Sequence, residues 1–444
     1  MGSEEDNALC IAKALADYIQ IKHGYAFKSE FFTESETDNI LLTPGNVEIG
    51  GGFKLHKPKF YDGVVTEEFV FNEGDIFVAM TDLSKNADIL GYPAKVPHLR
   101  GKRFLHNQRL GKIIFKKNSV ITPNYLYWLM HTKEYREHVL SCSSGTTVKH
   151  TSPDRILSFS PKIPPISEQS SVSKILDNLD KKITLNIKIS KILEEIARAI
   201  FKRWFIDFEF PNENGEPYKS SGGEMIDSPL GPIPKGWRVA KVNTLGDIIC
   251  GKTPPKNQRV FYENANIPFI KIPDMHSQVF AVKTNDRLSC AAIKFMRKKL
   301  LPANSICVSC IATVGKVVMT SRESFTNQQI NSIIPNRECL VYYTYFLMKE
   351  LRNTLVQMAS SGSATLNLNT KMFSDISIIL PSELIILRFH ETAKCLFRRI
   401  LLNQSEMNTL ISLRDTLLPK LMSGEIRVAD IEDKLGRGSN AEST

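Results

Sequence analysis

The stretch from Val172 to Phe205, VSKILDNLDKKITLNIKISKILEEIARAIFKRWF, determines how the rest of the sequence is organised. Ten of its positions recur with alternating spacings of four and three, which is the pattern of a helix that packs along another helix. They are Val172, Leu176, Leu179, Ile183, Asn186, Ser190, Leu193, Ala197, Ile200 and Trp204. Adding 217 to each number gives Phe389, Ala393, Leu396, Ile400, Asn403, Met407, Leu410, Arg414, Leu417 and Leu421. The sequence therefore predicts that the partner helix belongs to the same chain, with Leu176, Leu179, Ile183, Asn186, Leu193, Leu396, Ile400, Asn403, Leu410 and Leu417 in the seam.

The remainder of the chain is also duplicated. The offset is 230 for Leu15–Ile19 over Leu245–Ile249 and for Gly74–Met80 over Asn304–Cys310, 220 for His106–Phe115 over Thr326–Pro335, 218 for Tyr125–Met130 over Tyr343–Met348, and 217 for Ser143–Val148 over Ser360–Thr365. A period of about 220 residues is too long for a solenoid, so each repeat is predicted to be a domain plus a helix. The fall from 230 to 220 places ten extra residues in the first copy, between Met80 and His106.

Each copy mixes short strands with helices. Runs rich in Val, Ile and Phe, separated by Gly, Asn and Pro, predict strands, and residues 125–140 and 343–358 have helical periodicity. We therefore expect an α+β fold with an internal pseudo-two-fold repeat, in which two similar domains are separated by a pair of long antiparallel helices, a coiled-coil spacer. The predicted parts are a first domain at 1–166, a helix at 167–206, a Pro/Gly-rich connector at 207–236, a second domain at 237–383, a second helix at 384–424 and a polar tail at 425–444.

The composition favours an anionic partner. Lys and Arg number 57 against 47 Asp and Glu, which gives a net charge of +10 and a pI near 9; nucleic acid fits this charge, although a basic protein without such a ligand is the alternative. No apolar run is long enough to span a membrane, and the acidic start MGSEED lacks the basic region of a signal peptide, so a cytoplasmic location is expected. Eight scattered cysteines are typical of reduced thiols.

Two short motifs have structural interpretations. Gly246 to Thr253, GDIICGKT, matches a phosphate-binding loop, but Pro254 and Pro255 block the helix that such a loop needs. We therefore predict a strand that leads into a basic loop. Cys307 and Cys310 have CxxC spacing, yet the run is apolar and has no second pair, so it is predicted to be strand interior. No motif nominates a catalytic residue or a metal ligand.

Basic and polar loop residues are the candidates for DNA contact. They are Lys54, His56, Lys57, Lys59, Arg100, Lys102 and Arg103 in the first copy, and Lys252, Thr253, Lys256, Arg259, Lys271, Lys283 and Arg287 in the second. Any single one of them could be plain solvated surface; the set as a whole supports DNA binding. The dipeptides Asn107-Gln108 and Asn327-Gln328 recur in both copies, which indicates a shared structural turn more than base readout.

Four stretches resemble the specificity subunit of type I restriction-modification enzymes: FKRWFIDFEFP at 201–211, GPIPKGWRV at 231–239, IPPISEQ at 163–169 and LRDTLLPKLMSGEIRV at 413–428. The resemblance covers nearly the whole chain and implies two target recognition domains, each reading one part of a split, asymmetric DNA sequence. It implies no catalytic site and no cofactor in this chain. The implied partners are double-stranded DNA, two modification subunits that use S-adenosylmethionine to methylate adenine, and restriction subunits that use ATP and Mg²⁺. In the second copy LPSEL at 380–384 departs from this pattern.

Two other functional classes fit the sequence less well. A methyltransferase acting alone would need a cofactor-binding domain that no stretch supplies, and a scaffold without DNA leaves two basic domains unexplained. Within the seam, Asn186 and Asn403 are polar residues at positions that favour apolar ones. We hypothesise that they meet near the centre of the antiparallel pair and fix its register; the alternative places both at the edge of the seam, in water.

Overall fold

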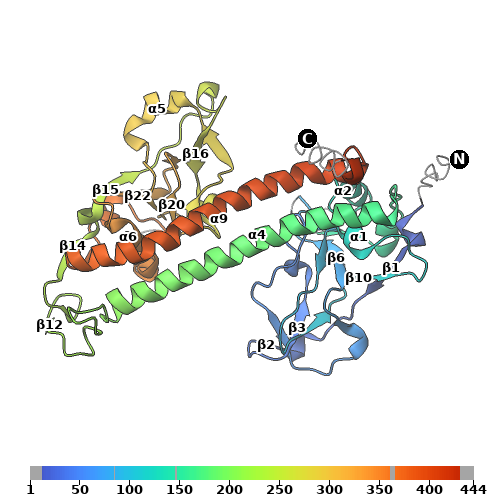
Figure 1. Cartoon of the computed structure of the whole chain (residues 1–444), viewed down its shortest axis with the longest axis horizontal. Helices are drawn as coiled ribbons and strands as arrows, with labels where there is room; N and C mark the ends of the chain where they lie inside the picture. Colours follow the sequence, from blue (N-terminus) through green and yellow to red (C-terminus); the bar gives the residue numbers. More distant parts are fainter. Residues whose placement is uncertain (1–12, 85, 146–147, 361–365, 431–444) are drawn as a thin grey trace, which may run out of the picture. The chain divides into compact units, whose positions relative to one another are not determined.

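The computed structural model describes residues 13–84, 86–145, 148–360 and 366–430 (Figure 1). The N-terminal decapeptide MGSEEDNALC, part of the 143–148 and 360–365 repeat, and the end of the polar tail lie outside the described residues. The chain divides into two compact units. Unit 1 comprises the residues up to Asp180 and those from Ser412 onward, and unit 2 comprises Lys181–Ile411. Within the described residues, no helix is both long enough and apolar enough to span a membrane.

Domain 1, residues 13–165 of unit 1, contains two sheets. The first has the order β1 (Ile19–His23), β10 (Leu110–Phe115), β6 (Ile76–Ala79), β8 (Pro93–Lys95), and the second has the order β2 (Phe32–Thr33), β4 (Lys59–Tyr61), β3 (Asn39–Leu42), β9 (Arg103–His106), β5 (Val70–Phe71). A further pair joins β7 (Thr81–Asp82) to β11 (Lys149–His150). The helices are α1 (Pro123–Leu129), α2 (Lys133–Ser141) and α3 (Pro153–Leu157). Figure 1 shows β6 and β10 next to α1, with β2 and β3 at the far side of the domain.

Domain 2, residues 233–382 of unit 2, repeats this plan. Its larger sheet has the order β15 (Gly246–Cys250), β22 (Ile330–Pro335), β19 (Ile306–Ser309), β20 (Val317–Thr320), β17 (Phe280–Ala281), and its smaller sheet has the order β18 (Asp286–Leu288), β16 (Ile267–Ile270), β21 (Phe325–Thr326). A short pair joins β14 (Arg238–Lys241) to β23 (Ser377–Leu380), and another joins β12 (Met225–Ile226), in the connector before domain 2, to β13 (Ile233–Pro234). The helices are α5 (Cys290–Met296), α6 (Leu340–Glu350), α7 (Arg352–Ser360) and α8 (Thr370–Ser374). In Figure 1, α5 and β16 lie farther from the long helix α9 than β20 and β22 do.

Strand pairing defines the internal repeat more precisely than the sequence does. In domain 1 Ile76 of β6 pairs with Lys95 of β8, and in domain 2 Ile306 of β19 pairs with Met319 of β20. The offset between the copies is therefore 230 at β6, as predicted, and 224 at β8. It reaches 220 at β10, where Leu110 pairs with Ala79 as Ile330 pairs with Ser309. The ten extra residues of the first copy are therefore divided into six before β8 and four after it.

One predicted alignment is wrong. His23 pairs with Gly111 as Cys250 pairs with Asn331, so β1 corresponds to β15 with an offset of 227. The sequence match of Leu15–Ile19 with Leu245–Ile249 used 230, and the hydrogen-bonded register excludes that shift. Gly24 therefore corresponds to Gly251, and the residues that follow them can be compared one by one.

Two long helices complete the units. Helix α4 (Ile166–Phe201) continues through one π-helical turn, Lys202–Ile206, and α9 spans Glu383–Ser423. Both helices contribute to both units. Within unit 2 Asn186 contacts Glu406 while Phe201 contacts Phe389, so rising numbers in α4 meet falling numbers in α9. The predicted antiparallel pair is confirmed.

The aromatic motif after α4 anchors the connector. The ring centroids of Phe210 and Trp237 stack 5.1 Å apart, and Phe205 lies 5.9 Å from Trp237 and 5.1 Å from Phe389 of α9. This cluster is continuous with the core of domain 2. In unit 1, the backbone N–H of Val428 donates to Glu168 at 3.1 Å, which ties the closing motif to the first turn of α4. Both motifs therefore have structural roles.

Candidate nucleic-acid interface

A tight corner stands at the end of β15 in domain 2. We call residues 251–253 and 326–329 the second corner. A Cβ atom placed on Gly251 would lie 2.2 Å from the carbonyl oxygen of Asn327 and 2.4 Å from that of Thr326, so only glycine fits. The next N–H, of Lys252, donates to the Thr326 carbonyl at 2.9 Å. The basic loop is thus held against the Asn-Gln turn.

Domain 1 builds the same corner from residues 24–26 and 106–109, which we call the first corner. A Cβ on Gly24 would lie 2.3 Å from the carbonyl oxygens of both His106 and Asn107. The Tyr25 N–H donates to the His106 carbonyl at 2.9 Å, and the Gln108 N–H returns to the Tyr25 carbonyl at 3.1 Å. The glycine contact and the bond from the next N–H match those of the second corner, at an offset of 227 for one segment and 220 for the other.

The Asn and Gln of the two corners have different roles. Asn107 and Asn327 are buried, and the side-chain oxygen of each accepts the N–H two residues later, from Arg109 at 2.9 Å and from Gln329 at 3.2 Å. Gln108 and Gln328 are exposed. The predicted shared turn is confirmed for the asparagines, whereas the glutamine side chains face outward.

The corner is electrostatically asymmetric between the domains. His106 is 1% exposed, and burial lowers the pKa of its imidazole to about 4, so the ring is neutral at physiological pH. Its Nε2 lies 3.0 Å from the Leu110 carbonyl, which makes this nitrogen the donor. Thr326 has the corresponding position in domain 2. Because His106 contributes no charge, attraction for an anion there depends on the exposed cations.

Several predicted DNA-contact residues already have carboxylate partners. Lys102 lies 2.8 Å from Glu36 and 3.7 Å from Asp38, and Lys54 lies 3.7 Å from Glu48. Arg103 pairs with Glu67, and Lys271 pairs with Asp286. Their charges are at least partly balanced inside the domain, which leaves them less available to a phosphate.

The other predicted residues are exposed or lie in the second corner. His56, Lys57, Lys59, Arg100, Lys256, Arg259, Lys283 and Arg287 are exposed and have no ion pair within the residues that the structure describes. Lys252 is exposed, and its ammonium lies 5.0 Å from the centroid of the Phe295 ring, itself 47% exposed. The hydroxyl of Thr253 donates to the side-chain oxygen of Gln328 at 2.7 Å. The structure thus brings Lys252 and Thr253 together with Gln328.

The two motifs with alternative interpretations are part of the scaffold. Strand β15 ends at Cys250, and no helix follows Thr253 before the short turn at Arg259–Phe261. Cys307 lies within β19 and Cys310 directly after it; both are buried, and burial raises the pKa of the Cys307 thiol to about 12 and that of Cys310 to about 11. The predictions of a strand leading to a basic loop and of a strand interior are confirmed.

The seam residues are placed as the heptad pattern requires. All ten are buried or half-buried, namely Leu176, Leu179, Ile183, Asn186, Leu193, Leu396, Ile400, Asn403, Leu410 and Leu417. Asn186 and Asn403 are each 1% exposed, which excludes the alternative at the edge of the seam. Helix α9 also buries Phe397 and Gln404, which the heptad positions did not include, because a second face of this helix packs on domain 2. Gln404 accepts the Phe280 N–H at 3.0 Å.

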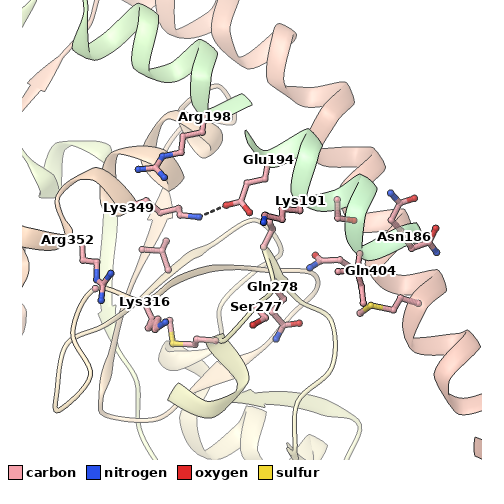
Figure 2. A pocket seen from close by; sticks show the side chains of 18 residues that line it. Asn186, Lys191, Glu194, Arg198, Ser277, Gln278, Lys316, Lys349, Arg352 and Gln404 are labelled. Atoms are coloured by element: carbon pink, nitrogen blue, oxygen red, sulfur yellow. Dashed lines mark hydrogen bonds and ion pairs between the residues drawn. The ribbon is translucent and has the colours of Figure 1, made fainter. Parts of the chain in front are cut away.

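Asn186 and Asn403 line one pocket of about 540 Å³ in unit 2, but they do not bond to each other. The Asn186 amide donates to Glu406 at 2.9 Å, and this hydrogen bond lowers the pKa of the carboxyl. The Asn186 side-chain oxygen and the Asn403 side-chain nitrogen have no partner within the described residues. Figure 2 shows Asn186 and Gln404 on one side of the pocket and Lys349, bonded to Glu194, on another. The seam therefore contains a polar layer.

Sequence comparisons point in one direction. The family model described as "Type I restriction modification DNA specificity domain" matches residues 13–196 and 234–385. The chain is 39% identical over 367 residues to the specificity subunit of the type I restriction enzyme HindI of Haemophilus influenzae, covering 71% of this chain and 80% of that protein. It is 30% identical over 333 residues to the MjaIX specificity subunit of Methanocaldococcus jannaschii, covering 72% of each.

A solved structure has the same fold. The S subunit of a type I restriction-modification system from M. genitalium aligns over 92% of this chain and 95% of its own, with a TM-score of 0.56 and 14% sequence identity.

Proposed function

Because the chain belongs to the type I restriction-modification DNA specificity family, we propose that domain 1 and domain 2 each read one half of a split, asymmetric DNA target. The family assigns the chain the role of a non-catalytic specificity subunit with two target recognition domains. The observation that supports the two-part target is the duplicated corner, which has one backbone and two sets of exposed side chains. Identical domains would favour a symmetric site, whereas different ones favour two unlike half-sites.

The exposed cations are proposed to hold phosphates beside each half-site. Lys57 and Arg100 in domain 1, and Lys256 and Arg259 in domain 2, have no carboxylate partner in the described parts of the chain. Such contacts position a protein on the duplex without reading sequence, and they make binding depend steeply on salt. The ion-paired Lys102 and Arg103 contribute less under this proposal.

The helix pair is proposed to set the gap between the half-sites. Helix α4 has 36 residues, which at about 1.5 Å per residue is a length of roughly 54 Å. Inserting one helical turn at matching positions of α4 and α9 is expected to change the unread gap while each half-site keeps its sequence. A change in the half-sites themselves would contradict this division of labour.

The outward face of α4 is proposed to bind the modification subunits. Leu185, Ile192 and Ile196 are 49%, 54% and 45% exposed, and together with Ile189 they form one apolar stripe with spacings of four, three and four. A stripe of this kind on a helix suits a protein partner. Ile192→Asp is expected to abolish co-purification with the modification subunit, while Thr184→Asp, at an exposed position outside the stripe, leaves it intact.

The complex proposed around this chain contains modification subunits that methylate adenine with S-adenosylmethionine, and restriction subunits that use ATP and Mg²⁺. Mapping methylated adenines in DNA from cells that carry this chain and its modification partner tests the function directly. A split motif with two unlike halves is the expected result, and a continuous motif would contradict it. Methylation by this chain alone would favour a self-sufficient methyltransferase, and the absence of salt-sensitive binding to a bipartite duplex would favour a scaffold.

A further inference from the structure

We infer that Gln108 and Gln328 are specificity-determining residues, each hydrogen-bonding base edges in one half-site. The inference rests on the proposed function and deepens it, because neither residue is among the basic candidates and the Asn-Gln dipeptide by itself indicated only a turn. The two glutamines have equivalent positions, at an offset of 220, in corners that share the glycine contact and the hydrogen bond from the residue after the glycine, Tyr25 N–H to His106 and Lys252 N–H to Thr326.

The two residues of each dipeptide have separate roles. Asn107 and Asn327 are buried and accept backbone N–H groups, so the turn does not depend on the next side chain. Gln108 and Gln328 are exposed. A turn fixed by a buried asparagine and an obligatory glycine gives the exposed glutamine a well-defined backbone position, which base reading requires.

The glutamine side chain has the chemistry to read bases. An amide carries two N–H donors and one oxygen acceptor, the combination that pairs with adenine or, through the donors alone, with other acceptors in the major groove. Lysine and arginine next to it hold phosphates but carry little sequence information. Lys252 is adjacent in the second corner and Arg109 in the first, and both are exposed. Each corner thus places one base-reading glutamine next to one cation.

Gln328 and Gln108 differ in their hydrogen-bond neighbours. In the second corner the Thr253 hydroxyl donates to the Gln328 side-chain oxygen at 2.7 Å, so this oxygen is occupied while the amide N–H groups keep their donor capacity. Ala26 has the position of Thr253 in the first corner and offers no such bond. Gln328 therefore presents donors and would select a base acceptor, whereas Gln108 keeps both donor and acceptor and suits a two-bond contact to adenine.

Each corner also carries an exposed ring that can cover the reader's flank. Tyr25 is 46% exposed, with its ring 5.2 Å from both Phe27 and Phe69, and Phe295 is 47% exposed beneath Lys252. An aromatic face excludes water from a neighbouring hydrogen bond and packs against a thymine methyl or a sugar. The two rings come from different parts of the two domains, so the surroundings of the readers differ.

The test measures discrimination in each half-site separately. The full chain, assembled with its modification subunit, is compared with Gln108→Ala and Gln328→Ala for binding to duplexes in which every target base pair is changed in turn. Gln108→Ala is expected to lose about tenfold or more of the discrimination at one position of the first half-site and none in the second. Gln328→Ala gives the mirror result. Each variant is the matched control for the other.

Two further variants keep the test independent of folding. Gln328→Glu keeps the shape but removes the donors, and is expected to lose at least as much discrimination as alanine. Thr253→Val removes only the positioning hydroxyl, and is expected to change base preference in the second half-site while discrimination in the first half-site stays as in the wild type. Unchanged discrimination in both half-sites, or an equal loss in both from each single variant, would overturn the inference. Failure of the wild type to bind any split target would instead overturn the proposed function.

Discussion

Domain 1 and domain 2 have the same buried framework and different exposed surfaces. Each fixes a glycine against an Asn-Gln turn, and each caps its α3 or α8 helix with a side chain at equivalent positions, Ser152 and Asn369. The side chains around this framework differ: exposed Tyr25 corresponds to exposed Lys252, and exposed Arg109 corresponds to half-buried Gln329, which accepts from Asn327 at 2.9 Å. The buried residues determine where each domain would contact DNA, and the exposed residues determine which groups of the DNA they would contact.

Insertions and deletions between the two copies also fall in the variable loops and not in the shared framework. The offset between the two copies is 227 at β1, 230 at β6, 224 at β8 and 220 at β10. From α3 and α8 through the long helices it stays at 217. Insertions are tolerated where a loop surrounds a half-site, because closing a longer surface loop costs little free energy. They are excluded from the helices, since a shift of one residue would turn the seam away from its partner.

The largest expected effect comes from removing the framework in one domain only. Gly24→Val is expected to destabilise unit 1 by about 4 kcal/mol, because its Cβ would lie 2.3 Å from two backbone carbonyl oxygens. Gly251→Val is expected to do the same to unit 2. Hydrogen exchange measured by mass spectrometry, peptide by peptide, reports each unit in the same sample.

Gly45→Ala is the control for this pair. Its Cβ would meet only the Thr43 hydroxyl at 3.5 Å, so exchange is expected to stay close to that of the wild type. If Gly24→Val accelerated exchange equally in both domains, the two frameworks would not be independent.

A second difference between the domains is sensitive to pH. The pKa of His106 is about 4 in the folded chain and about 6.5 when unfolded. Between these values the unfolded state binds the proton and the folded state does not, so this group's contribution is present above pH 6.5 and is lost as the pH falls toward 4. The loss is on the order of 3 kcal/mol. His106→Thr, the residue at this position in domain 2, should flatten the pH dependence of unit 1; an unchanged slope would contradict this explanation.

Much of this architecture could be predicted from the sequence, for a physical reason. A seam repeats every seven residues, so arithmetic assigns Asn186 and Asn403 to equivalent seam positions, and their burial in the structure decides between the centre and the edge of the seam. Leu15–Ile19 was aligned three residues away from its true partner because five residues carry too short a pattern to define a register. An odd shift exchanges the two faces of a strand, and only the pairing of β1 with β10 and of β15 with β22 reveals it. The hydrogen-bond partner of Asn186 and the exposure of Gln108 depend on tertiary contacts that no local pattern contains. Gly24 and Gly251, which follow the corresponding strands β1 and β15, are the residues from which the two corners could have been predicted.

The helix pair itself differs between the units, which a third experiment can exploit. In unit 1 Arg414 bridges the helices to Asp180 at 3.0 Å, whereas in unit 2 the polar layer leaves the Asn403 amide nitrogen buried without a partner among the described residues. Asn403→Leu is expected to stabilise unit 2 by about 1 to 2 kcal/mol. Asn186→Leu with Asn403→Leu should also relax the register, seen as altered spacing of the methylated half-sites. Leu179→Asn, which adds an amide to the seam in unit 1, should have the opposite effect on stability. No change in stability or spacing would eliminate the polar layer as a register device.

The smallest expected effect distinguishes cations that are free from cations that are already paired. Lys256 in domain 2 is exposed and has no ion pair in the described ranges, while Lys102 in domain 1 is held by Glu36 and Asp38. A lysine that contacts a phosphate releases about one counterion, so Lys256→Ala should reduce the slope of log affinity against log salt by about 0.9. Lys102→Ala should leave the slope unchanged, because its charge is already neutralised. The sequence gives both residues the same charge, so equal slopes for the two variants would mean that total charge, not its local pairing, determines how this chain holds DNA.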